Sequence, residues 1–137
     1  MAVVEYGPPL SLADAKNVLH AAEAEAAANQ WAMVIAVLDS SAHLVALHRM
    51  DHAQYASVEV AQAKGKTALN FKRPTKVFEE GLAAGQLRWL GMPDICPLEG
   101  GIPILKDGKI VGGIGVSGGS AAQDAQVAAA GAKVLGA

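Results

Sequence analysis

The chain has 137 residues, a formal net charge of −2, 52% hydrophobic and 4% aromatic residues, and one cysteine, Cys96. This length predicts a single domain over residues 1–137, and the slightly negative charge argues against a nucleic-acid partner. A lone cysteine excludes a disulfide framework and a cysteine metal cluster, and we predict no metal-ion site. No apolar run reaches membrane-spanning length, so we expect a soluble, cytoplasmic protein with no membrane partner.

The first predicted element is a helix that begins after Ser11 and ends near Asn29. Ser11 and Asp14, three residues apart, resemble a capping box. Apolar residues then recur at helical spacing and predict one buried stripe: Leu12, Ala15, Leu19, Ala22 and Ala26. Two short apolar runs follow, Val34–Leu38 and His43–His48, and the polar turn between them predicts a β-hairpin.

The second half of the chain repeats the alternation of helix and hairpin. The predicted elements are a helix over Tyr55–Phe71, a helix over Lys76–Ala84 capped by Thr75, and strands on both sides of Asp107-Gly108. A last helix, capped by Ser120 with Gln123, is predicted to run to about Leu135. Strands joined by hairpins form an antiparallel sheet, so we predict an α+β fold with helices packed on that sheet.

Glycines are concentrated between residues 112 and 119. Gly113-x-Gly115-x-x-Gly118 matches the dinucleotide fingerprint, but that motif belongs to a parallel sheet with a further strand downstream, which this chain lacks. Two interpretations stay open. Gly118, Gly119 and Ser120 open a helix whose N–H groups can hold an anion, or the glycines permit a helix to pack closely on the sheet.

Several segments together resemble the GlcG/HbpS family of small haem-binding or haem-degrading domains, which also resembles the C-terminal domain of PduO-type proteins. They are Val37-Leu38-Asp39, Arg49-Met50-Asp51, Ser57–Lys64, Thr67-Ala68, Gly100–Ile104 and the Asp107–Gly118 glycine pattern. The resemblance covers nearly the whole chain. It implies a profilin-like α+β fold with a five-stranded antiparallel sheet, assembly into a homo-oligomer, and association with haem or a corrinoid in some members.

The segment His48–His52 is the richest in functional groups. Its imidazoles can ligate haem iron or exchange protons near neutral pH, Met50 can be a second iron ligand, and Arg49 can bind a propionate or a substrate carboxylate. The alternative interpretation is a solvated strand end. His20 lies away from the apolar stripe of its helix, so it is either a surface histidine or a haem ligand at a subunit contact.

Lys64 and the Trp89–Pro93 segment each allow two interpretations. Lys64 falls beside a strip of small residues, where a partly buried amine can act as a base or bind an anion; alternatively its stem covers alanines and its amine reaches water. Trp89–Pro93 can wall an apolar pocket or anchor a subunit interface.

Two functional hypotheses follow, from different classes. The first is a protein that binds haem or a related tetrapyrrole, with a histidine on the iron and with Arg49, Lys64 or the Gly118–Ser120 helix start receiving propionates. The second is a cofactor-free lyase or isomerase of a small aromatic or 2-hydroxy carboxylate, in which His48 or His52 moves a proton and Lys64 stabilises negative charge. A purely structural partner of another enzyme is a third interpretation.

Overall fold

The computed structural model describes residues 3–136 and confirms the α+β class and the predicted order of elements. The elements are α1 (Leu12–Ala28), β1 (Val34–Asp39), β2 (Leu44–Arg49), α2 (Ser57–Phe71), α3 (Lys76–Ala83), the 3₁₀ helix η1 (Leu87–Gly91), β3 (Gly101–Lys106), β4 (Lys109–Ser117) and α4 (Ala121–Ala132). The final helix ends before Leu135, earlier than its apolar pattern predicts.

The sheet has four antiparallel strands in the order β2-β1-β4-β3, so the five-stranded prediction is wrong for the described residues. The lead before α1 runs beside the start of β4 but forms only an isolated bridge between Tyr6 and Ile110. Pro8 and Pro9 follow after Gly7, and a proline has no N–H to donate to a ladder, so the next backbone bond to β4 comes from the Leu10 amide to the Val111 carbonyl (3.0 Å). The two prolines thus interrupt the pairing, and the lead does not form a continuous fifth strand.

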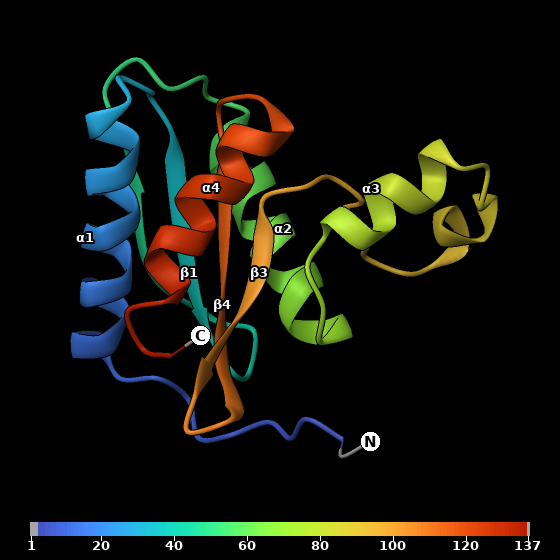
Figure 1. Cartoon of the computed structure of the whole chain (residues 1–137), viewed down its shortest axis with the longest axis horizontal. Coiled ribbons are helices and arrows are strands. Elements are labelled where there is room, and N and C mark those ends of the chain that lie inside the picture. Colours follow the sequence, from blue (N-terminus) through green and yellow to red (C-terminus); the bar gives the residue numbers. More distant parts are fainter. Residues whose placement is uncertain (1–2, 137) are drawn as a thin grey trace.

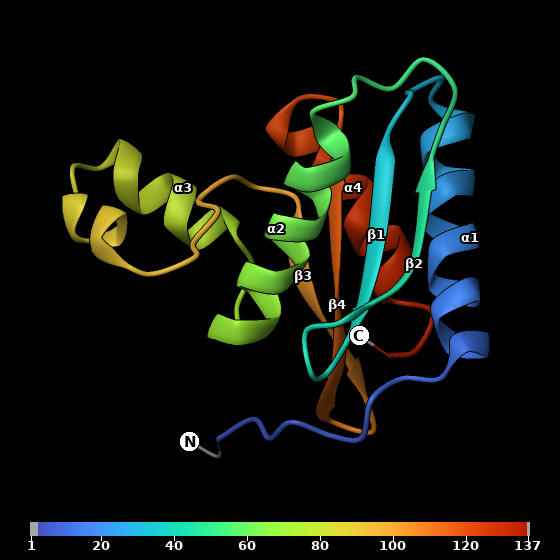
Figure 2. The ribbon, with the colours of Figure 1, turned by 180° about the vertical axis from the view of Figure 1, so that it is seen from behind.

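Helices cover both faces of the sheet. Figures 1 and 2 show α1 and α4 side by side on one face and α2 on the other. The larger core lies under α1 and α4, with Leu19, Ile35, Ile114 and Val127 among its fully buried residues. The segment carrying α3 and η1 projects away from the sheet as an arm.

Close packing of α2 on β4 explains the glycine-rich strand. A Cβ atom on Gly113 would lie 2.6 Å from the carbonyl oxygen of Gly65, and one on Gly115 would overlap the carbonyl oxygen of Ala61. Both acceptors belong to the α2 backbone, which cannot move aside as a flexible side chain can. The glycines at 113 and 115 therefore allow a helix to contact a strand backbone to backbone.

The helix starts test the capping predictions. Ser11 accepts a hydrogen bond from the Asp14 amide (3.1 Å), which confirms it as the N-cap of α1, although Asp14 returns no bond and the capping box is not complete. Ser120 forms a full capping box with Gln123, as predicted. Thr75 does not cap α3, contrary to prediction. Its hydroxyl instead accepts from the Gly101 amide (2.9 Å), because Thr75 is fully buried against β3. Leu12 is 54% exposed and lies outside the buried stripe of α1.

Candidate functional site

The end of β2 lines an open groove beside α1. We call it the β2-edge groove; its volume is about 450 Å³ and it is lined by Glu23, Leu47, His48, Arg49, Met50 and Asp51. Three of the predicted site residues, His48, Arg49 and Met50, therefore share one groove. The groove is shallow and widely open to solvent, so one chain alone does not enclose a ligand here.

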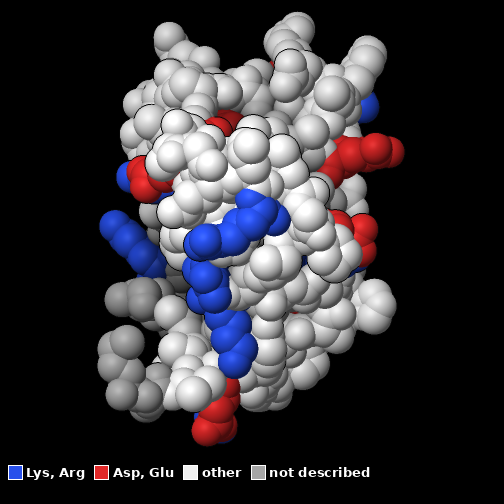
Figure 3. Space-filling view, turned by 90° about the vertical axis from the view of Figure 1, so that its right-hand side faces the viewer, with Lys and Arg blue, Asp and Glu red and all other residues white. Residues whose placement is uncertain are grey.

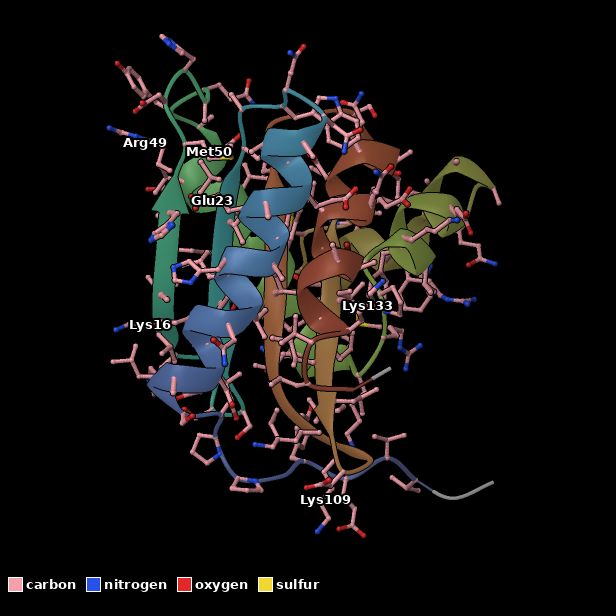
Figure 4. The ribbon with its side chains drawn as sticks, turned by 60° about the vertical axis from the view of Figure 1, so that its left-hand side comes forward. Lys16, Glu23, Arg49, Met50, Lys109 and Lys133 are labelled. Carbon is pink, nitrogen blue, oxygen red and sulfur yellow. The ribbon has the colours of Figure 1, made fainter. Side chains whose placement is uncertain are left out.

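Strand geometry distributes these side chains over two faces. Successive residues of a strand point to opposite sides, so His48 and Met50 share the side that faces α1 while Arg49 points away from it. Figure 4 shows Met50 beside Glu23 of α1 and Arg49 directed outward. The backbone N–H of Met50 donates to the Met33 carbonyl (3.0 Å), which fixes the chain where β2 ends.

A carboxylate from α1 holds the His48 ring. Nδ1 of His48 lies 3.0 Å from Oε1 of Glu23, and the two side chains are 45% and 36% exposed. The His20 ring, also from α1, has its centroid 6.0 Å from the His48 centroid. The fold thus gathers His20, Glu23 and His48 on one surface.

The loop after β2 lines a second pocket, which we call the loop pocket. It has a volume of about 400 Å³ and is lined by Arg49–Tyr55. The Arg49 guanidinium carbon lies 5.4 Å from the centre of the Tyr55 ring. His52 has φ +72°, a left-handed turn conformation, and it lines this pocket and not the groove. The structure therefore separates His52 from His48.

Lys64 forms a buried ion pair. Its Nζ donates to Oδ2 of Asp124 (2.8 Å) and to the Val116 carbonyl (2.9 Å), with side-chain exposures of 4% and 5% for the lysine and the aspartate. The amine thus does not reach water, contrary to one of the two interpretations of Lys64. Burial raises the pKa of Asp124 above its usual range, although the bonds from Lys64 and from the Gly119 amide act in the opposite direction.

The predicted anion cradle has partners within the chain. The Gly119 amide donates to Oδ1 of Asp124 (2.9 Å), and the Ser120 amide donates to the Gln123 side chain (3.0 Å). Gly118 has φ +139°, and a Cβ there would lie 2.7 Å from the Ala32 carbonyl oxygen. An anion bound at Gly119 would compete with a carboxylate that is already in place.

Lys64 and the helix start nevertheless line a common pocket of about 280 Å³. We call it the ion-pair pocket; its polar lining residues are Gln54, Lys64, Glu79, Glu99, Ser117 and Asp124. The buried hydroxyl of Ser117 donates to that of Ser57 (2.9 Å). Three carboxylates face one amine here, and this balance does not favour a carboxylate substrate. Gln54 also lines the loop pocket, so the two pockets are neighbours.

The arm carries Trp89, Arg88 and two exposed leucines. Trp89 packs edge-on against Phe78, with ring centroids 5.0 Å apart, and Arg88 lies over the Trp89 ring at 4.9 Å. Leu87 and Leu90 of η1 are 67% and 66% exposed. Figure 3 shows a line of Lys and Arg side chains on the face from which the arm projects. The arm is thus held by aromatic packing and leaves leucines uncovered.

Two residues that form these contacts cannot be predicted from the sequence. Glu23 lies three residues after His20 on α1, but the sequence does not show that His48 contacts the same face. Asp124 lies sixty residues from Lys64 along the chain, in a first turn where an acidic residue is explained by the helix dipole alone. Only the packing of α2, β4 and α4 brings this pair together.

The fold and these pockets define a small α+β domain with a histidine-bearing groove at a sheet edge. The family model described as "Haem degrading protein HbpS-like" matches residues 10–133. The chain is 43% identical over 108 residues to Protein GlcG of Escherichia coli, covering 79% of this chain and 81% of that protein. The chain therefore belongs to the HbpS-like family.

Solved structures agree with this assignment. A double mutant of Streptomyces reticuli HbpS has a TM-score of 0.86 and 31% identity, covering 100% of this chain and 97% of its own. A structure described as a PduOC:heme complex has a TM-score of 0.80 and 28% identity, covering 90% of this chain and 92% of its own.

Among residues 3–136, no helix is both long and apolar enough to cross a membrane.

Proposed function

We propose that the chain binds haem, or a closely related tetrapyrrole, in the β2-edge groove. The observation that carries this proposal is that the groove combines an imidazole held by a carboxylate, a thioether and a guanidinium, from His48, Met50 and Arg49. Haem needs an iron ligand, an apolar surface for the macrocycle and cations for its propionates. The haem complex of a structural relative supports the same ligand.

The groove residues fit these three needs. His48 supplies a nitrogen donor, and Met50 supplies half-buried apolar surface on the same side of the strand, whereas Leu47 packs on the opposite face of the sheet. Arg49 lines both the groove and the loop pocket, so its guanidinium can reach a carboxylate at the rim of the groove. When bound, haem supplies a redox-active iron, and these residues bind, orient and shield it.

A second copy of the chain completes the site in this proposal. Ligand sites usually bury most of the ligand surface, but the His48 side chain remains 45% exposed in one chain. The exposed Leu87 and Leu90 of the arm supply apolar surface for contacts between copies. We therefore propose a closed homo-oligomer, which sedimentation at micromolar concentration tests; a monomer mass would contradict it.

A haem titration followed by absorption spectroscopy tests the ligand. Wild-type protein should develop a Soret band that differs from that of free haem and saturates at a fixed stoichiometry. Arg49→Ala should weaken haem binding roughly tenfold or more with the band position kept, because a propionate partner holds the macrocycle without touching the iron. Absence of saturable binding to the wild type would refute the proposal.

Arg88→Ala is the matched control. Like Arg49, Arg88 is an exposed arginine whose guanidinium lies over an aromatic ring, but it lies on the arm. Its removal should leave haem affinity unchanged. Equal losses in both variants would show that general positive charge, and not the groove, attracts the haem. The lyase or isomerase activity stays a prediction; a turnover screen of small carboxylates tests it separately.

A further inference from the structure

We infer that the ion-pair pocket binds a small primary ammonium compound that also carries an oxygen acceptor, such as a carbonyl group next to the carbon that bears the nitrogen. Glu79 and Glu99 receive the ammonium group of this ligand, and Lys64 donates a hydrogen bond to its oxygen. The pocket shares no lining residue with the β2-edge groove, so this binding does not depend on haem.

Lys64 has one hydrogen-bond donor left over. An ammonium group carries three N–H bonds. Residues 3–136 provide two acceptors for them, Oδ2 of Asp124 (2.8 Å) and the Val116 carbonyl (2.9 Å). The lysine side chain is only 4% exposed, and a buried donor without an acceptor costs free energy. Since Lys64 lines the ion-pair pocket, an oxygen atom in that pocket can accept the third bond.

Glu79 and Glu99 carry the negative charge that the ion pair leaves uncompensated. The two oxygens of Asp124 accept from Lys64 and from the Gly119 amide. No cation among residues 3–136 lies within ion-pair distance of Glu79 or Glu99. Burial raises the pKa of Asp124 and the charge of Glu79 adds to that effect, so Glu79 lies close to the pair. Two uncompensated carboxylates favour a cation in this pocket.

The size and depth of the pocket restrict the ligand. Its volume of about 280 Å³ lies just below the usual range of small-molecule sites, so it holds a ligand of only a few heavy atoms. Lys64, Ser117 and Asp124 are buried, whereas Glu79 and Glu99 are half-buried and nearer to solvent. The ligand oxygen therefore points inward to Lys64, and the ammonium group stays near the entrance.

Three related probes test the ligand class in ¹H–¹⁵N NMR titrations at pH 6, where α-amino groups are protonated. Alaninamide carries both the ammonium group and the carbonyl, propanamide lacks the ammonium group, and sec-butylamine lacks the oxygen. Alaninamide should bind with a dissociation constant on the order of 1 mM and shift the amides of Gly118 and Gly119. Each of the other probes should bind roughly tenfold more weakly or worse. Absence of saturable shifts with alaninamide would overturn the inference, as would equally tight binding of propanamide.

Neutral variants of the two glutamates test the ammonium contact. Glu79→Gln and Glu99→Gln should each weaken alaninamide binding roughly tenfold, because each removes a charge and keeps the size of the side chain. Glu80→Gln is the matched control: Glu80 neighbours Glu79 on α3 but is exposed and does not line the pocket. Its affinity should equal that of the wild type. Equal losses in all three variants would show that general negative charge, and not the pocket, attracts the amine.

The contact with Lys64 is tested first on the wild type. The ¹⁵N signal of the Lys64 ammonium should shift on addition of alaninamide and stay in place with sec-butylamine. The double variant Lys64→Met/Asp124→Asn, which leaves no buried charge uncompensated, tests the same contact by removal. It keeps both glutamates, so it should bind alaninamide and sec-butylamine with equal affinity, and circular dichroism checks its fold. An unmoved Lys64 signal in saturated wild-type protein, or a preference for alaninamide that survives in the folded double variant, would overturn the role of Lys64.

Discussion

The ammonium of Lys64 and the carboxylate of Asp124 meet at 2.8 Å in the interior, and this contact joins the middle of α2 to the first turn of α4. Lys64 also donates to the Val116 carbonyl near the end of strand β4, and Asp124 accepts from the Gly119 amide. One ion pair thus ties together three elements from both faces of the sheet. Removing one partner leaves a buried charge uncompensated.

Lys64→Met should therefore lower the free energy of unfolding by about 3–5 kcal/mol. The double variant Lys64→Met/Asp124→Leu should recover much of this loss, since neither charge then remains buried. Urea unfolding of the two variants measures the difference. If Lys64→Met kept wild-type stability, the ion pair would have no structural role. That result would favour the alternative interpretation, in which Lys64 acts as a base.

The contact of α2 with β4 gives a second prediction. A Cβ on Gly115 would overlap the Ala61 carbonyl oxygen, so Gly115→Ala should force the helix away from the sheet and destabilise the fold by several kcal/mol, on the order of other overpacked cores. Gly91→Ala is the control, because nothing lies within 4 Å of the position of its Cβ and its φ is not positive. Thermal unfolding should separate the two; similar melting temperatures would contradict the close contact.

Local signals account for what the sequence predicts correctly. Helical spacing in residues 12–26, the Ser120–Gln123 capping box and the Asp107-Gly108 turn each depend on residues close in the chain, and both turn residues have positive φ in the structure. The family resemblance implies a five-stranded sheet, but Pro8-Pro9 interrupts the pairing of the lead with β4, which is reduced to one isolated bridge. The local sequence predicts Thr75 as a helix cap, because its actual contact, with Gly101, is long-range and leaves no local signal.

The site residues also differ in whether local sequence signals predict them. The sequence identifies His48, Arg49 and Met50 because they are adjacent, and the structure places all three in one groove. It does not reveal Glu23, because the bond to His48 spans twenty-five residues and two elements. Nor does it separate Arg49 from Lys64, which line different pockets in the fold.

Cys96 provides a third test. Burial raises the pKa of its thiol above the usual range, although the nearby charge of Lys64 lowers it in part. At pH 8 the thiolate fraction should thus be smaller than that of a free cysteine, whose pKa is about 8.5. The rate of alkylation by iodoacetamide, followed from pH 7 to 10 by mass spectrometry, should rise with a midpoint above that value. A midpoint below it would contradict the burial of the thiol.

The turn between β1 and β2 makes stability depend on pH through Asp39. Burial raises the pKa of this carboxyl, but hydrogen bonds from Ser41 and His43 outweigh that effect and leave the pKa below its usual range. A carboxyl with a lowered pKa stabilises the fold when ionised. Its contribution is therefore complete above the unfolded pKa of about 3.9 and is lost as the pH falls through the lower folded value.

Asp39→Asn keeps an oxygen acceptor for the turn but removes the charge. The variant should be less stable than wild type at pH 6, and the difference should shrink as the pH falls below about 4, because wild-type Asp39 then becomes protonated as well. Urea unfolding between pH 2.5 and 7 measures both curves. Asp51→Asn serves as the control, an exposed aspartate for whose carboxylate residues 3–136 provide no hydrogen-bond donor. A stability difference for Asp39→Asn that stayed constant over this range would show that the charge of Asp39 does not stabilise the turn.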